Sequence, residues 1–600
     1  MLGSSRSSSS SSFVDVDPEV KKQLDRYRGV WGKWRNNNTT VVEKDVCVLE
    51  TTFPCLDPKQ ILPDLWLYNM ASDLPPIVMM PVAGCHVPKG SWYDSILEKM
   101  KLRVKREYKQ SFSLPDLTAG AQLYLRVAQA AQKIRLFKEK GKWRLRVSAG
   151  VTVEEAEAYL HKRKLAFRFV NNPTIQKVSV VGALANDCYG PGKNHPSMTG
   201  NIAEMRVISP KGELLNLRKK GPHKNLFRIF RHRHMGAAFY VRDVVLKNIT
   251  RRFRVKRTSV LYKDYKAFKK GMKENDWIGK EHFIMQFFPV DIEKEGDHFF
   301  RYRVVTFERT DEKPKKSAKP GYLKDIWTFL SLMSTEIGEP LIDLIVRSEN
   351  LHVFLPYLFR LAAKTTFGSE ENVVEIGWSH LMAHIFDTYT DLPIHDVNWL
   401  IDVEGEEDAQ ELLLKLMRVN RNHLRAAQKS EEYPIFNAFG RYYKSAKTGK
   451  MVLSVELLTY PFLAKSMAYL DLEDAFLDFL DREEYKYDFH PGKHLPARLR
   501  SLPEVYANDP ERMEELEIFK SAVCCLHGGE EMIRFSPILS EAKKRFLGFL
   551  EPVEASGKFR YWCTEEQEKR ALNKIIELAE CDECEDIAGQ AREQLAQFLS

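Results

Sequence analysis

The stretch that most constrains this chain runs from Val178 to Leu214. Its β-branched start, residues 178–181, predicts a strand that enters a segment rich in glycine and alanine. A second strand is predicted over residues 205–208, and it leaves through a turn at residues 210–212. Successive backbone N–H groups in a glycine-rich loop can form a concavity that binds anions. The segment therefore predicts a site for a flat or anionic ligand, and an ordinary surface loop is the alternative.

A similar unit comes earlier in the chain. Residues 77–82 predict a strand that enters a loop at residues 83–88, which contains one histidine, His86. Between the two loops, residues 145–150 predict a strand that turns into a helix beginning near Val153. Two loops thus follow two predicted strands, with a third strand between them.

These loops, in this order, resemble those of the vanillyl-alcohol-oxidase-type flavoproteins, which carry the PCMH-type FAD-binding domain. The second loop contributes VVGA at residues 180–183 and YGPG at residues 189–192, followed by EMRVISPKGE at residues 204–213. The resemblance extends over about residues 31–550 and is greatest to the sugar-lactone and alditol oxidase branch. It implies FAD as the cofactor. It also implies cofactor-binding positions at Gly84, Cys85, His86, Val87, Gly150, Gly182, Ala183, Ala185, Tyr189, Gly190 and Gly192.

The first loop bears on how the flavin is held. In the sugar-lactone and alditol oxidase branch, the histidine of this loop carries the flavin covalently at the 8α methyl, and His86 falls on that place. This loop lacks two glycines and a serine of the family pattern. Covalent attachment through His86 and non-covalent binding are therefore both left open.

The sequence pattern changes after Ile249. Alternating aromatic strands are predicted over residues 282–288 and 299–307, with amphipathic helices over 323–366 and 407–428 and another strand over 451–460. Such a mixture suits an antiparallel sheet with helices that covers a flavin ring. We therefore expect an α+β protein with the two-domain PCMH-type FAD-binding fold and a substrate cap. The expected parts are a disordered Ser-rich tail (1–12), the FAD-binding domain (13–250), the cap with a C-terminal return segment (251–550) and a helical extension (551–600).

The most specific chemical signal in the C-terminal half is FHPGKH at residues 489–494. It resembles the late H-W-x-K motif of aldonolactone and alditol oxidases, with Pro491 in place of tryptophan. The resemblance implies catalytic roles for His490 and Lys493. A cation at Lys493 would stabilise the negative charge that develops as hydride leaves carbon for flavin N5. A turn with exposed charges is the alternative.

A second pocket element resembles the family's F-P-x-E-x-R strand. Arg441 matches its arginine, which implies a third catalytic residue. Phe439 occupies the place of the glutamate, or an insertion displaces that residue, so the polar pair looks incomplete. Glu456 is a candidate substitute, although a charged residue on an alternating strand usually faces solvent.

These features predict an FAD-dependent oxidoreductase that acts on a CH–OH group of a sugar lactone, polyol or sterol-like alcohol. Electrons would pass to oxygen or to a protein acceptor. The alternative is a catalytically degenerate descendant that serves as a binding or scaffold protein, and the lost glycines, Phe439 and Pro491 favour it.

Composition bears on the partners, the cysteine chemistry and the location of the protein. The 91 Lys and Arg residues against 82 Asp and Glu give a net charge of only +9. Basic stretches such as residues 251–257 are therefore interpreted as solvated faces, and no nucleic-acid partner is expected. Nine irregularly spaced cysteines argue against a disulfide framework. Only Cys581 and Cys584 have metal-ligand spacing, and no metal site is predicted. The serine-rich start is no signal peptide and no apolar run could span a membrane, so a cytoplasmic location is expected.

Overall fold

The structure is a computed structural model. It describes residues 78–82, 122–126, 134–168, 173, 178–289, 300–313, 372–382, 395–429, 437–459, 464, 466–536, 538–539 and 541–550. The first loop with Gly84, Cys85, His86 and Val87, the helices expected over 323–366, the Ser-rich tail and the C-terminal extension lie outside the described residues.

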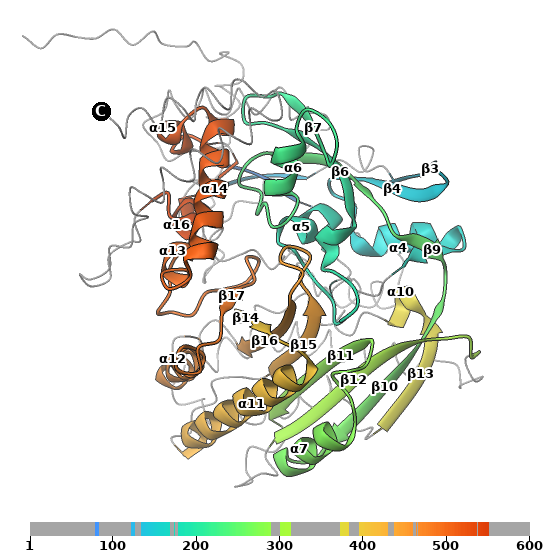
Figure 1. The fold of residues 1–600 in the computed structure, drawn as a ribbon, viewed down its shortest axis with the longest axis vertical. Helices are drawn as coiled ribbons and strands as arrows, with labels where there is room; N and C mark the ends of the chain where they lie inside the picture. The colour runs from blue at the N-terminus through green and yellow to red at the C-terminus, as the bar shows by residue number, and fades with distance from the viewer. Residues whose placement is uncertain are drawn as a thin grey trace, which may run out of the picture.

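The N-terminal half is built on a five-stranded antiparallel sheet (Figure 1). Two smaller pairs accompany it, the parallel pair β1 (Val78–Val82) with β2 (Gln122–Arg126) and the antiparallel pair β5 (Leu165–Phe167) with β9 (Ile249–Arg251). The order in the five-stranded sheet is β3 (Ile134–Glu139), β4 (Lys142–Ser148), β8 (Tyr240–Leu246), β6 (Ile202–Ile208) and β7 (Leu214–Arg218). The predicted strands over 77–82, 145–150 and 205–208 are thus confirmed, with small differences at their ends.

Helix α4 (Val153–Lys162) begins where the sequence predicts a helix. Thr152 caps it: its Oγ1 accepts a hydrogen bond from the Glu155 N–H at 3.1 Å, and the Glu155 carboxylate accepts one from the Thr152 N–H at 2.8 Å. This reciprocal pair satisfies two N–H groups that the first turn leaves without partners. Val153 and Leu160 are buried against the sheet.

The segment predicted as a strand over residues 178–181 is instead the start of helix α5 (Val180–Ala185), so that prediction is wrong. Ser179 caps the helix, because its Oγ accepts a hydrogen bond from the Gly182 N–H at 3.0 Å. Ala183 and Ala185 are strong helix formers, and the cap sets the chain into helix despite the β-branched start. A Cβ at Gly182 would lie 2.7 Å from the Ser179 Oγ, which explains the glycine as a packing requirement of the cap.

The second half is an eight-stranded antiparallel sheet, with α7 (Tyr265–Glu274), α11 (Glu406–Lys429) and α12 (Met467–Arg482) packed on it (Figure 1). The strand order is β13 (Asn372–Trp378), β10 (Arg254–Tyr262), β12 (Phe300–Thr310), β11 (His282–Pro289), β15 (Asn437–Lys444), β16 (Met451–Thr459), β14 (His395–Val403) and β17 (Tyr487–Phe489). A short helix, α10 (Ser379–Met382), follows β13. Fully buried aromatic side chains such as Trp399, Tyr302 and Phe287 fill the core of this half of the protein. Burial of a side chain such as Phe287 contributes about 1.5–3 kcal/mol to the free energy of folding. The strands predicted over 282–288, 299–307 and 451–460 and the helix over 407–428 are confirmed.

The chain then returns to the first sheet. Four helices, α13 (Leu502–Val505), α14 (Pro510–His527), α15 (Glu530–Ile533) and α16 (Glu541–Leu547), follow β17, and Figure 1 shows α14 beside α6 (Lys224–Phe230). Leu516 and Val523 of α14 are buried in the same core as Phe230. The C-terminal segment therefore completes the hydrophobic core of the N-terminal half.

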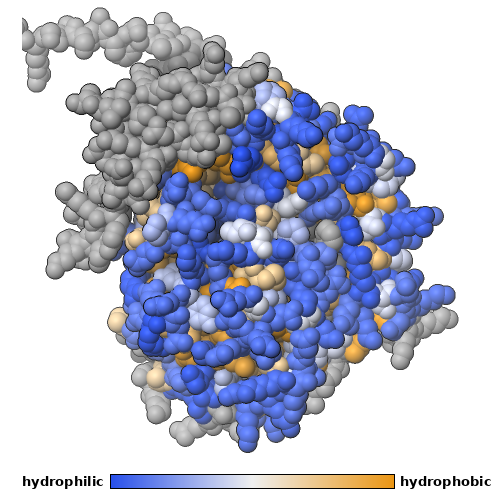
Figure 2. Space-filling view, in the orientation of Figure 1, coloured by the Kyte–Doolittle hydropathy of each residue, from blue (hydrophilic) through white to orange (hydrophobic). Residues whose placement is uncertain are grey.

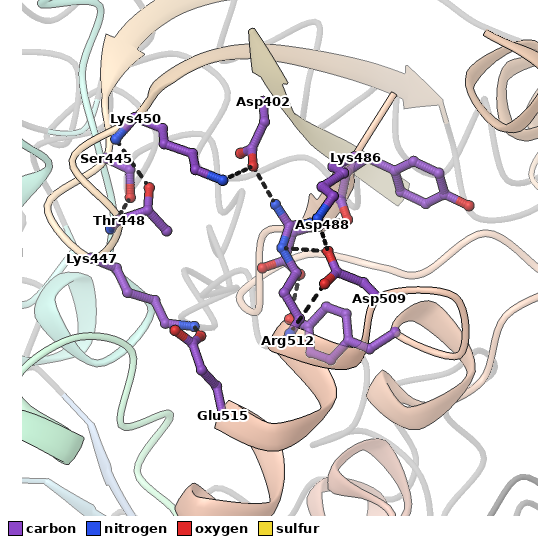
Figure 3. A network of polar contacts seen from close by, with 12 residues as sticks. Asp402, Ser445, Lys447, Thr448, Lys450, Lys486, Asp488, Asp509, Arg512 and Glu515 are labelled. Carbon is purple, nitrogen blue, oxygen red and sulfur yellow. Dashed lines mark hydrogen bonds and ion pairs between the residues drawn. The ribbon is translucent and has the colours of Figure 1, made fainter. Parts of the chain in front are cut away.

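A polar network joins α14 to the eight-stranded sheet (Figure 3). Arg512 donates to Asp402 at the end of β14 at 2.9 Å, and its Nε lies 3.6 Å from the Asp509 carboxylate. Lys447, in the turn between β15 and β16, pairs with Glu515. Because Arg512 is largely buried, this network fixes the direction from which the segment after β17 reaches the sheet.

The face of the molecule seen in Figure 2 is mainly hydrophilic, with apolar side chains scattered between polar ones. Among the helices that the structure describes, none combines the length and the apolar composition needed to cross a membrane.

Candidate functional site

The FHPGKH segment forms a tight turn directly after β17. The Lys493 N–H donates to the His490 carbonyl at 3.0 Å, and the Gly492 N–H donates to Nδ1 of His490 at 3.1 Å. The His490 N–H in turn donates to the Asn398 carbonyl of β14 at 3.2 Å. A turn is present, but its charges are not exposed: His490 is buried and the Lys493 side chain is only 22% exposed. The turn thus carries Lys493 into the protein, against the edge of β14.

Lys493 pairs there with Asp396 of β14 through Nζ and Oδ2. Burial raises the pKa of Asp396 to about 6, against the opposing effect of the Lys493 ammonium. Burial alone would lower the pKa of Lys493, but the carboxylates of Asp396 and Glu456 outweigh it and hold that pKa above its ordinary value. Lys493 is therefore a cation at neutral pH. The second oxygen of Asp396, Oδ1, is buried without a hydrogen-bond partner in the described part of the chain.

Arg441 forms a second buried ion pair beside the first. Its Nη1 donates to Oε1 of Glu456 at 2.9 Å, and both side chains are at most 7% exposed. Glu456 lies directly opposite Phe439 in the register of β15 and β16. The neighbouring strand therefore supplies a carboxylate next to the position where the family pattern has its glutamate. Burial would raise the pKa of Glu456, but Arg441 and Lys493 together lower it, so the carboxylate is ionised.

Tyr189 links this cluster to the N-terminal half. Its hydroxyl accepts from the Asn398 amide at 2.6 Å and shares a hydrogen bond with the Ser454 hydroxyl at 2.6 Å. Asn398 also donates to Glu456 at 2.7 Å. The Tyr189 ring stacks on Tyr443 with centroids 4.0 Å apart, and His490 meets it edge-on at 5.7 Å. Burial raises the pKa of Tyr189, so its hydroxyl stays protonated.

The three catalytic residues that the sequence predicts, Lys493, Arg441 and His490, thus come together around Tyr189. Burial and neighbouring cations keep the pKa of His490 well below its ordinary value, so its imidazole is neutral and supports the turn. Sequence reasoning misses Asp396, Asn398 and Ser454. The signal that could have found the first two is a pair of polar residues two positions apart, which places both on the same face of strand β14.

The predicted cofactor-binding residues that the structure describes lie in three places. Gly150 follows β4 with a φ of +88°, a left-handed conformation that favours glycine. Gly182, Ala183 and Ala185 belong to α5. Gly190 and Gly192, with Tyr189, lie in loop 186–197, which docks on β11: Lys193 donates to the Glu281 carbonyl and Phe283 to the Pro191 carbonyl, each at 3.1 Å.

Some N–H groups in and beside residues 182–192 have partners within the chain. The Gly182 N–H donates to Ser179, the Cys188 N–H to the Ala183 carbonyl at 2.8 Å, and the Lys193 N–H, directly after this segment, to the Glu281 carbonyl. These three N–H groups are not available to an anion. Cofactor contacts through this segment stay a prediction.

The cluster as a whole is two cations and two carboxylates withheld from water. In such a setting charges interact more strongly than at the surface, and fixed donors stabilise charge that develops on a reacting oxygen. A carboxylate with a pKa near 6 and one unpartnered oxygen can also take a proton at neutral pH. The arrangement therefore suits chemistry in which an alcohol loses a proton and a hydride.

Comparison with known proteins bears on which cofactor accompanies that chemistry. A family described as "FAD binding domain" matches residues 111–218, which include β4, α4, α5, loop 186–197 and β6. No curated protein matches the sequence significantly.

Solved structures share the fold. A solvent-stable cholesterol oxidase aligns with a TM-score of 0.51 at 12% identity, over 70% of this chain and 86% of that one. The cholesterol oxidase from Brevibacterium sterolicum aligns with a TM-score of 0.52 at 12% identity, over 82% and 91%. A histidine-to-alanine mutant of the Brevibacterium sterolicum enzyme gives 0.53 at 11% identity, over 81% and 92%. The expected α+β, PCMH-type FAD-binding fold is confirmed, and the FAD binding domain with this fold indicates an FAD-dependent oxidoreductase.

The residues present fit a flavin. Arg441 Nε is buried without a hydrogen-bond partner in the described part of the chain, and it is a donor for an electron-rich carbonyl edge. Arg441 and Lys493 are cations of the kind that stabilise charge on a reduced ring. Arg441 and Lys493 thus provide buried hydrogen-bond donors and positive charge of the kind that FAD requires.

Proposed function

We propose that this protein is an FAD-dependent oxidase or dehydrogenase that oxidises a CH–OH group of a sugar lactone, polyol or sterol-like alcohol. Oxygen or a protein would accept the electrons. The observation that carries the proposal is the pair of buried ion pairs, Lys493 with Asp396 and Arg441 with Glu456, beside Tyr189. Keeping both pairs buried is costly for a protein that needs only a fold, which argues for a function in chemistry.

When bound, FAD accepts the hydride that leaves the substrate carbon. Lys493 and Arg441 would stabilise the negative charge of that transfer, and Arg441 would also hold the polar edge of the ring through its free Nε. Asp396 would take the proton of the substrate hydroxyl through Oδ1, so that the C–H and O–H bonds break as the C=O bond forms. Tyr189 would orient the substrate side of the cluster.

Two observations bear on the substrate class. The solved structures that share the fold are cholesterol oxidases, which favours a sterol-like alcohol. The buried Oδ1 of Asp396, which has no hydrogen-bond partner in the described part of the chain, favours a substrate that presents a hydroxyl group to it, because buried polar groups reject a partner that leaves them unpaired. We propose in addition that residues 13–250 bind FAD, with His86 as the residue of any covalent link, and that residues 251–550 form the substrate cap with a C-terminal return segment.

The test uses full-length protein expressed with ample riboflavin. The absorbance spectrum after gentle purification reports bound flavin, and acid precipitation reports whether the flavin is covalent. Anaerobic mixing with a sugar lactone, a polyol or a solubilised sterol should bleach the flavin with one of these classes. Bound flavin that none of them reduces would favour the scaffold alternative, and the absence of flavin binding on titration would overturn the proposal.

A further inference from the structure

Three side chains that can bind a metal meet where loop 186–197 docks on β11. They are His195 of the loop and Glu281 and His282 at the start of the strand, and one ligand atom from each lies within 4.8 Å of the other two. The backbone brings them together through a bridge between Gly192 and His282. Within the described residues, this is the one group of three or more such side chains with that spacing.

His282 is prepared as a ligand. Its side chain is 2% exposed, and Nδ1 lies 3.2 Å from the Phe307 carbonyl, where it donates a hydrogen bond. With its proton on Nδ1, the ring has a lone pair on Nε2, and that atom is buried without a hydrogen-bond partner. Histidines that bind metals usually have this arrangement, in which a carbonyl fixes the tautomer from the other side of the ring. A buried nitrogen without a partner is unfavourable unless something binds it.

The surroundings of His282 suit a cation. The carboxylate of the adjoining Glu281 faces His195, with 3.1 Å between its Oε1 and the His195 Nε2. It offers the negative charge that a metal ion needs beside two imidazole ligands. Arg309 also acts on Glu281 and His282, and it balances part of the carboxylate's charge.

We propose that His195, Glu281 and His282 bind one divalent transition-metal ion of the class that prefers imidazole ligands, with Zn²⁺ as its representative. Two imidazoles and one carboxylate are a known type of ligand set for this ion, with water in the remaining position. Bonds of about 2.0–2.1 Å place tetrahedral ligand atoms roughly 3.4 Å apart. The ligand atoms of the three residues lie within 4.8 Å of one another, so binding the ion requires only small shifts of these side chains. His195 can move inward, because it lies on a loop and its side chain is still 12% exposed.

The bound ion would fasten loop 186–197 to β11. That loop also carries Tyr189, whose hydroxyl contacts Asn398 and Ser454, so the ion would hold one wall of the candidate active site in place. The proposal does not depend on the proposed reaction. The sequence predicts no metal site because His195 and Glu281 are 86 positions apart, and only the docking of the loop on β11 brings them together.

The test is calorimetric titration of metal-stripped, full-length protein with Zn²⁺ alone. The wild type should bind one equivalent that His195→Ala and His282→Asn do not bind, with at least a hundredfold loss of affinity at that site. His423→Ala, which removes a histidine of α11 outside the cluster, is the matched control and should bind as the wild type does. Zn²⁺ should also raise the melting temperature of the wild type and of the control.

Cys581 and Cys584 have metal-ligand spacing, so all variants are also made with both cysteines replaced by serine. Far-UV circular dichroism and flavin content verify that each variant is folded. Should His282→Asn fail to fold, His195→Ala decides, because its side chain is less buried. Unchanged Zn²⁺ stoichiometry and affinity in folded His195→Ala would overturn the proposal.

Discussion

Replacing Lys493 by methionine separates the contribution of its charge from that of its volume. Lys493→Met keeps the length of the side chain and removes the cation that pairs with Asp396. Loss of one preorganised charge-stabilising donor typically costs about 2.7–4 kcal/mol in the barrier, which predicts a roughly hundredfold to thousandfold slower reduction of the flavin. The measurement is anaerobic stopped-flow absorbance with saturating substrate, so that weaker binding does not contribute.

Lys493→Met also affects the free energy of unfolding, and this effect can be separated from the effect on the rate of flavin reduction. Removing one partner of a buried ion pair costs about 3–5 kcal/mol when the other charge stays behind. Asp396 can reduce this cost by taking a proton, because burial already raises its pKa to about 6 and the loss of the cation raises that pKa further. Because a protonated carboxyl costs less to bury than a carboxylate, we expect the variant to lose less than about 3–5 kcal/mol of unfolding free energy. The double variant with Asp396→Asn should recover the stability without recovering the rate.

Lys447 provides the matched control. It also pairs with a carboxylate, that of Glu515, but its side chain is 34% exposed and lies outside the cluster (Figure 3). Lys447→Met should change stability by at most about 1 kcal/mol and leave flavin reduction unchanged. If Lys493→Met reduces its flavin as fast as the wild type does, the role given to Lys493 is wrong and the scaffold alternative gains support.

Three further predictions follow from the buried contacts. Glu456→Gln leaves Arg441 without its carboxylate and should lower the free energy of unfolding by about 3–5 kcal/mol, measured by urea denaturation, with slower flavin reduction. Burial alone would raise the pKa of Asp488, but its pair with Arg233 lowers it from 3.8 to about 2; this stabilisation, about 2 kcal/mol, is present above pH 3.8 and is lost as the pH falls through 2. Urea denaturation between pH 2 and 5 should show that loss in the wild type and not in Asp488→Asn. Ser179→Ala removes the α5 cap and should cost about 0.5–2 kcal/mol, and an unchanged melting temperature would contradict the capping role.

Periodicity was sufficient to predict some strands of both sheets, among them β4, β6, β11, β12 and β16, because alternating or continuous apolar runs are decided locally. Others, such as β3, β10 and β14, were not predicted. The prediction over residues 178–181 is wrong for an equally local reason. Valines at 180 and 181 favour a strand on their own, but the hydrogen bond from the Gly182 N–H to Ser179 makes the next residues a helix. A capping residue that begins a six-residue helix is a weaker sequence signal than three β-branched residues.

The candidate site was predictable only where a motif carries it. Lys493, His490 and Arg441 follow from patterns of neighbouring residues, and the structure gathers them. Asp396 and Asn398 have no motif, since their importance depends on which strands flank β14, and that is a property of the whole sheet. Sequence spacing carries no information on the order of non-consecutive strands.

Glu456 shows how the missing polar pair can be restored by register. In an antiparallel pair, residues directly opposite one another share a face, so a carboxylate moved from one strand to the facing position of the next still reaches the same neighbours. Phe439 and Glu456 are such opposite residues, and Arg441, two positions along β15, lies within 2.9 Å of the carboxylate. From sequence alone, Phe439 in place of the family's glutamate favours a degenerate protein. In the structure, Glu456 on the neighbouring strand supplies a carboxylate beside that position. Apolar residues of similar size are often as stable as a buried ion pair, so the buried contact between Arg441 and Glu456 supports the proposed catalytic role over a purely structural one.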